Sequence, residues 1–60
     1  MNPEAMLGMT AQDNVTQVTG TVTAVCLYLN GDTHVRLEMV ADNQPIERWL
    51  PINRVTVRES

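Results

Sequence analysis

Apolar and polar residues alternate along most of this 60-residue chain, a spacing typical of strands that bury one face. Residues 15–29 are rich in valine and threonine, which favour a pleated, half-buried strand. Val18, Val22 and Ala24 share one parity, whereas Val25, Leu27 and Leu29 share the other. Because strict alternation cannot change phase without an extra residue, we predict one long strand with a bulge or a sharp bend near residues 23–25. Gly20 marks a second bend.

The strongest local turn signal in the chain is Asn30-Gly31. Between two apolar strands this pair predicts a type I′ hairpin turn, because both central residues of that turn need a positive φ. The register that follows places Cys26 opposite Val35 and turns His34 to the other face of the sheet.

Three further segments complete the expected set of strands. Residues 33–40 alternate cleanly, and residues 46–50 pair back on them across a turn indicated by the composition of residues 41–45. Pro51 cannot donate a ladder hydrogen bond, so the third strand should end there in one 3-10 turn. Residues 55–57 then form a last short strand.

Residues 1–14 differ from the rest of the chain and are predicted to be an N-terminal arm, either a short helix or disordered. Asn2 is suited to cap a helix, with Pro3 at the first helical position. A helix this short is not stable alone, so an ordered arm must dock on its own domain, residues 15–58, or on a second chain. The apolar residues available for docking are Met6, Leu7 and Met9.

The order of these elements resembles that of the small SH3-like and Sm-like β-barrels. The segments that carry the resemblance are residues 18–22, 30–32 and 49–57. It implies an all-β fold, a small SH3-like barrel of about five short strands with a 3-10 turn before the last strand. Many short proteins encoded by phages, prophages and plasmids are similar in layout, so we expect an origin of that kind.

Length and charge then limit the function. A chain this short buries only about 60% of its unfolded surface, and one cysteine cannot form an internal disulfide. One cysteine and one histidine cannot complete a zinc site without another chain. Four arginines and no lysine against seven acids, a net charge of −3, argue against a nucleic-acid partner. The chain has no apolar run long enough for a membrane span and no signal-peptide pattern, so we expect a cytoplasmic protein.

Side chains capable of catalysis are scarce. Cys26 and His34 are the only nucleophile–base pair, and the predicted hairpin register turns them to opposite faces. The three glycines are isolated and form no phosphate-binding loop. We therefore predict that the protein is not an enzyme and needs no cofactor or metal.

Aromatic residues are also few, because Tyr28 and Trp49 stand alone and phenylalanine is absent. Two aromatic rings cannot build a methyl-lysine cage or a base-stacking platform unless a second chain contributes further rings. Trp49 is interpreted either as the anchor of a protein contact or as a cover for an open barrel end or for the arm. Arg36 and Arg48, on neighbouring strands, are expected to flank it. The predicted binding residues are Tyr28, Arg36, Arg48, Trp49 and Arg54.

These features predict a small non-enzymatic interaction module that acts by stoichiometric binding of a partner protein, with homo-oligomers as a further expectation. Binding would use these residues or an exposed strand edge, for which the threonines at positions 19, 21 and 23 are the candidate. Two alternatives stay open: a structural subunit of a larger assembly, and a nucleic-acid-binding regulator whose arginines gather on oligomerisation. That patch would comprise Arg36, Arg48, Arg54 and Arg58.

Overall fold

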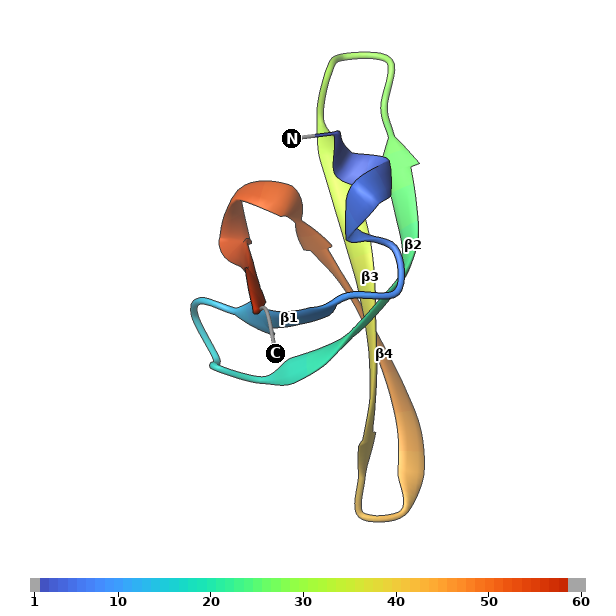
Figure 1. The fold of residues 1–60 in the computed structure, drawn as a ribbon, viewed down its shortest axis with the longest axis vertical. Coiled ribbons are helices and arrows are strands. Elements are labelled where there is room, and N and C mark those ends of the chain that lie inside the picture. Colours follow the sequence, from blue (N-terminus) through green and yellow to red (C-terminus); the bar gives the residue numbers. More distant parts are fainter. Residues whose placement is uncertain (1, 59–60) are drawn as a thin grey trace.

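Five antiparallel strands form one open sheet in the computed structural model, which describes residues 2–58 (Figure 1). The strands are β1 (Thr10–Asp13), β2 (Thr19–Leu27), β3 (Thr33–Ala41), β4 (Gln44–Pro51) and β5 (Val55–Arg58). They lie in the order β4-β3-β2-β1-β5, so β4 and β5 are the edges. Two 3-10 turns, η1 (Pro3–Met6) and η2 (Ile52–Arg54), are the only helical elements of residues 2–58. The all-β class and the 3-10 turn before the last strand are thus confirmed, whereas the sheet does not close into a barrel within these residues.

Strand β1 is the main element that the sequence analysis missed, because residues 1–14 were all assigned to an arm. Thr10–Asp13 instead lies between β2 and β5, with Ala11 opposite both Gly20 and Val57. Ala11 is the single apolar residue of this strand and is completely buried. The sheet therefore begins at residue 10. Thr21 is paired with Thr10 of β1 on one side and with Glu38 of β3 on the other, so at this threonine β2 offers no edge to a second chain.

Strand β2 bends as predicted. Val22 pairs with Leu37 and Ala24 pairs with Arg36, which leaves Thr23 as the extra residue of a bulge. The phase change in the apolar pattern is therefore confirmed as a bulge. In Figure 1 the strand curves from its pairing with β1 toward its pairing with β3.

The β2–β3 connection differs from the type I′ turn predicted at Asn30-Gly31. Pairing of the two strands ends at Leu27 and Thr33, and Gly31 is the single residue of this loop with a positive φ, 96°. The N–H of Gly31 donates to the carbonyl oxygen of Tyr28 at 3.0 Å. A longer loop closed by a left-handed glycine is the alternative hairpin geometry, so the predicted turn type and register are wrong.

A two-residue turn of the type I′ kind does occur, but between β3 and β4. Asp42 and Asn43 have φ of 53° and 62°, and the flanking Ala41 and Gln44 pair directly. Asparagine and aspartate tolerate this left-handed conformation better than other non-glycine residues. The turn expected within residues 41–45 is confirmed, although Pro45 already belongs to edge strand β4, where a proline is tolerated.

The N-terminal segment docks on the chain's own sheet. The side chain of Asn2 accepts a hydrogen bond from the N–H of Glu4, so the predicted N-cap is confirmed. Met6 of η1 is 4% exposed and belongs to the core. The N–H of Gly8 donates to the carbonyl oxygen of Val22 at 2.8 Å, which fixes the segment along β2.

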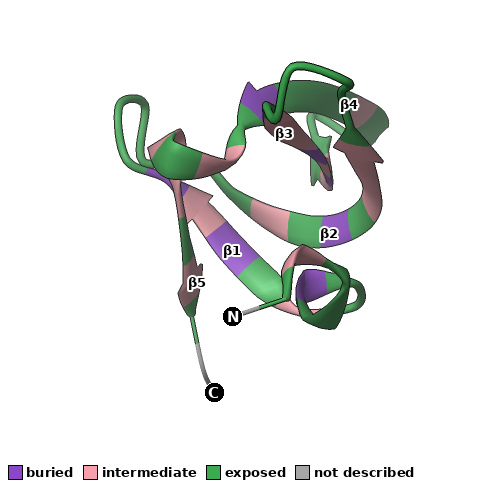
Figure 2. Cartoon of the chain, turned by 90° about the horizontal axis from the view of Figure 1, so that it is seen from above, coloured by how far each residue is buried: buried purple, intermediate pink, exposed green. Residues whose placement is uncertain are grey.

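The core lies on the concave side of the curved sheet, and Figure 2 shows its buried segments on η1, β1, β2 and β3. Its buried residues are Met6, Ala11, Val22, Val35, Leu37 and Leu50. Residues from η2 and β5 pack against this cluster, so every element of the described chain contributes to a small core. A chain this short depends on each of these contacts.

Gly20 occupies a place in β2 where no side chain fits. A Cβ atom there would lie 2.7 Å from the backbone carbonyl oxygen of Glu38 and 3.3 Å from Cε of Met39. We expect Gly20→Ala to lower the free energy of unfolding by about 1–3 kcal/mol, since the backbone of β3 must move aside. Urea unfolding measures this loss. Thr19→Ala, at an exposed neighbour in the same strand, should stay within about 0.5 kcal/mol of the native chain, and equal stability of the two variants would contradict the close approach.

Candidate functional site

Tyr28, Arg36 and Trp49, three of the five predicted binding residues, lie on the outer face of the sheet, opposite the core. Arg36 and Trp49 are direct partners across β3 and β4, and Cζ of Arg36 lies 5.7 Å from the centroid of the indole ring. Trp49 remains 49% exposed. The geometry is a cation–π contact. The N-terminal segment contacts β2 and contributes Met6 to the core, on the opposite side of the sheet from Trp49.

The same face continues toward the β2–β3 loop. His34 and Arg36 occupy alternate positions of β3 and so point to the same side. The Tyr28 ring meets the His34 ring edge to face, with centroids 5.0 Å apart and an interplanar angle of 79°. We name these four residues, Tyr28, His34, Arg36 and Trp49, the aromatic–arginine row.

Arg36 is held in place by polar contacts. Its Nε donates to Oγ1 of Thr23 at 3.0 Å, and its Nη2 lies 3.3 Å from the carboxylate of Glu38. The Thr23 hydroxyl in turn donates to that carboxylate at 3.0 Å. The bulge thus has a consequence for the site, because its extra residue supplies the hydroxyl that orients Arg36 beneath Trp49.

Arg48 does not flank Trp49, which corrects the prediction. It is the partner of Leu37 across β3 and β4 and therefore points to the inner, concave side. There it lines a groove of about 290 Å³ together with Arg54. The apolar residues of this groove are Val18, Leu37, Met39, Ala41, Ile46 and Leu50.

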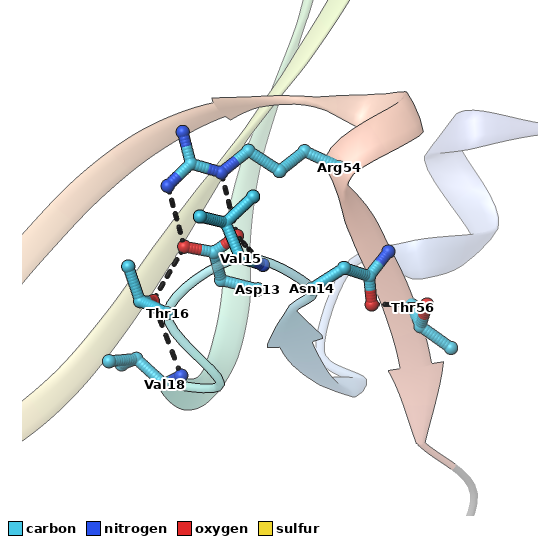
Figure 3. Close-up of polar contacts among 7 residues, drawn as sticks. All are labelled: Asp13, Asn14, Val15, Thr16, Val18, Arg54 and Thr56. Atoms are coloured by element: carbon cyan, nitrogen blue, oxygen red, sulfur yellow. Dashed lines mark hydrogen bonds and ion pairs between the residues drawn. The ribbon is translucent and has the colours of Figure 1, made fainter.

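Asp13 is a structural centre that sequence reasoning missed. It is 3% exposed, and its carboxylate accepts hydrogen bonds from Nε and Nη2 of Arg54 at 2.7 and 2.9 Å (Figure 3). It also accepts from the Thr16 hydroxyl at 2.6 Å and from the N–H of Val15 at 3.1 Å. The carboxylate therefore organises the β1–β2 turn in the manner of an Asx turn and ties it to η2.

The contacts of this ion pair shift the pKa of both Asp13 and Arg54. Hydrogen bonds from Arg54, and then from Thr16, hold the pKa of Asp13 far below its ordinary value of 3.8. The Asp13 carboxylate raises the pKa of Arg54 in return. Two of the guanidinium nitrogens of Arg54 are thus used inside the chain, which reduces what this predicted binding residue can offer to a partner.

The four arginines do not gather on one surface. Arg36 lies on the outer face, Arg48 and Arg54 line the inner groove, and Arg58 of β5 is hydrogen-bonded to Gln12. Arg36 and Arg54 are each balanced by a carboxylate. Within residues 2–58, a single chain therefore presents no continuous basic patch of the kind that phosphate backbones need.

Cys26 and His34 face the same side of the sheet, contrary to the predicted register, because they are direct partners across β2 and β3. Nδ1 of His34 is buried without a hydrogen-bond partner in residues 2–58, and hydrogen bonding to Cys26 raises the pKa of the Tyr28 hydroxyl. Within the same residues no group of three or more histidine, cysteine or acidic side chains is placed to hold a metal ion. The structure brings these two residues together without building a metal site.

Comparisons with known proteins return no match: no family model, no curated protein and no solved structure resembles this chain. Within the described part of the chain, no helix is both long and apolar enough to cross a membrane. The case for function therefore depends on the chain's own surfaces.

Proposed function

We propose that this chain is a non-enzymatic interaction module that binds a partner protein stoichiometrically through the aromatic–arginine row. The observation that carries the proposal is the half-exposed Trp49 stacked on an arginine that Thr23 and Glu38 hold in place. Tryptophan, tyrosine and arginine are the residues most enriched in binding hot spots. A surface that is already ordered loses little conformational entropy on binding.

The charge of the row favours a protein over a nucleic acid as partner. Arg36 is paired with Glu38, so the row presents aromatic area with little net positive charge. Binding to nucleic acid depends on arginines and lysines that neutralise phosphates. The alternative of a nucleic-acid-binding regulator therefore has less support than a contact with a protein surface.

We also propose that the sheet is a variant of the SH3-like barrel, in a cytoplasmic accessory protein of a phage or mobile element. The bent strand β2, shared between β1 and β3, and the 3-10 turn that returns β5 to β1 support the fold proposal. Neighbouring genes for phage or plasmid functions would support the origin. Neighbours with cellular housekeeping functions would contradict it.

Replacing Trp49 by alanine tests the proposed function. With the full chain immobilised as bait, we expect a captured partner to bind Trp49→Ala at least about 10-fold more weakly, the loss typical of a hot-spot residue. The unfolding temperature should change by only a few degrees, because Trp49 lies outside the core. Titration calorimetry with the captured protein measures the affinity.

Val40→Ala is the matched control, because Val40 is an exposed apolar residue on the outer face of β3 but outside the row. It should bind like the native chain. If Trp49→Ala folds and binds equally well, the row is not the contact surface. Should that variant fail to fold, Tyr28→Ala, at the exposed end of the row, provides the same test.

A further inference from the structure

A group of exposed apolar side chains lies at one end of the molecule, in the loop between β2 and β3. Leu29, in the loop between β2 and β3, is 107% exposed, and the adjacent Leu27 and Tyr28 are also exposed. The remaining loop residues are Asn30, Gly31 and Asp32, and Asp32 is an exposed acid. We name residues 27–32 the tip. Three consecutive exposed apolar residues on so small a protein are typical of a surface that another molecule covers.

The inner groove is the complementary feature, away from the tip. Its space of about 290 Å³ is lined by Met39, Ala41 and Ile46 of the β3–β4 hairpin, whereas the β2–β3 loop lies at the opposite end of β3 in Figure 1. A cavity of about 150 Å³ already accepts a benzene molecule. The groove therefore has room for a leucine side chain.

Charge at the two surfaces is complementary as well. The groove is lined by Asp13 and Arg54, which pair with each other, and by Arg48. The Nη1 of Arg48 donates to a backbone carbonyl oxygen, that of Glu47, rather than to a carboxylate. Three residues after Leu29, the side chain of Asp32 accepts from the side-chain amide of Asn30 at 3.2 Å. An incoming tip would thus bring a leucine to an apolar floor and an acid to an arginine.

We propose that the occupant of the groove is the tip of a second copy of this chain. Leu29 packs against the apolar floor, and Asp32 pairs with Arg48. Because tip and groove are different surfaces, the contact is heterologous, and each added copy leaves one free tip and one free groove. Copies therefore join head to tail into a ring or filament. Tyr28 belongs to both the tip and the aromatic–arginine row, whereas Arg36 and Trp49 of the row lie outside this contact.

Two substitutions test the contact from both sides by light scattering over a range of concentrations. The native chain should increase in mass with concentration, whereas Leu29→Glu and Arg48→Glu should each remain at the monomer mass of 6.7 kDa. Both positions are exposed, so both variants should fold. Leu7→Glu, at an exposed apolar residue outside tip and groove, should assemble like the native chain.

Mixing the two variants gives the decisive result. The Leu29→Glu chain retains a groove and the Arg48→Glu chain retains a tip, so the mixture should form dimers and nothing larger. A native chain that stays monomeric up to millimolar concentration would overturn the proposal. Assembly of Leu29→Glu alone, or a mixture that stays monomeric, would equally overturn it. Trp49→Ala should assemble normally, so failure here is distinguishable from failure of the partner contact.

Discussion

Replacing Leu37 by alanine should remove a large share of the chain's free energy of unfolding. Leu37 is completely buried and is the largest of the fully enclosed side chains. A leucine-to-alanine change in a core costs about 2–5 kcal/mol, whereas a domain of this length is stable by only roughly 3–9 kcal/mol. With six residues in the enclosed core, the cavity has few neighbours that can close it. Circular dichroism and urea unfolding measure the loss.

Two control variants show whether the loss of stability comes from the cavity at Leu37 or merely from changing the residue type. Val40→Ala removes methyl groups on the same strand at a residue 76% exposed, so it should stay within about 0.5 kcal/mol of the native chain. Leu37→Met keeps the volume and should cost less than about 1.5 kcal/mol. A Leu37→Ala chain as stable as the Val40→Ala chain would show that the core does not close around Leu37.

The parts of the fold that the sequence predicts are those determined by residues close together in the chain. The bulge at Thr23 follows from a change of parity among neighbouring apolar residues, and the 3-10 turn follows from Pro51. Strand β1 has one apolar residue, Ala11, and is held by pairing on both sides, so no periodicity reveals it. The hairpin at Asn30-Gly31 was assigned the wrong turn because loop length depends on which residues of the two strands pair.

The candidate site also contains residues whose placement the local sequence predicts and residues whose placement it does not predict. Parity along β4 places Trp49 away from Leu50, and the structure agrees. The same parity puts Arg48 on the side of Leu50, so alternation along β4 already separates Arg48 from Trp49. Asp13, by contrast, meets Arg54 from a position 41 residues earlier, and no local pattern contains that pairing.

Asp13→Asn should be the most destabilising change among the charged residues. The carboxylate accepts four hydrogen bonds through its two oxygens, and an amide would turn a donor toward donors on Arg54 or Thr16. An unpaired arginine would remain against the β1–β2 turn. We expect the unfolding temperature to fall by roughly 10 °C. Glu47→Gln, which also removes one negative charge, lies at an exposed residue with no ion pair in residues 2–58 and should be nearly neutral.

The pH dependence of the stability difference between the native chain and Asp13→Asn tests whether the Asp13 carboxylate causes that difference. Since the pKa of Asp13 is lowered in the folded chain from 3.8, the unfolded state binds more protons at acid pH, and stability falls as pH falls. The contribution is complete above roughly pH 5 and is lost as pH falls through 3.8 toward the folded pKa. Asp13→Asn lacks it at every pH. The gap in unfolding free energy between native and variant chains should therefore be widest at neutral pH and shrink below pH 3.8, as urea unfolding at a series of pH values measures. A gap that stays constant down to pH 2 would assign the loss to packing rather than to the ion pair with Arg54.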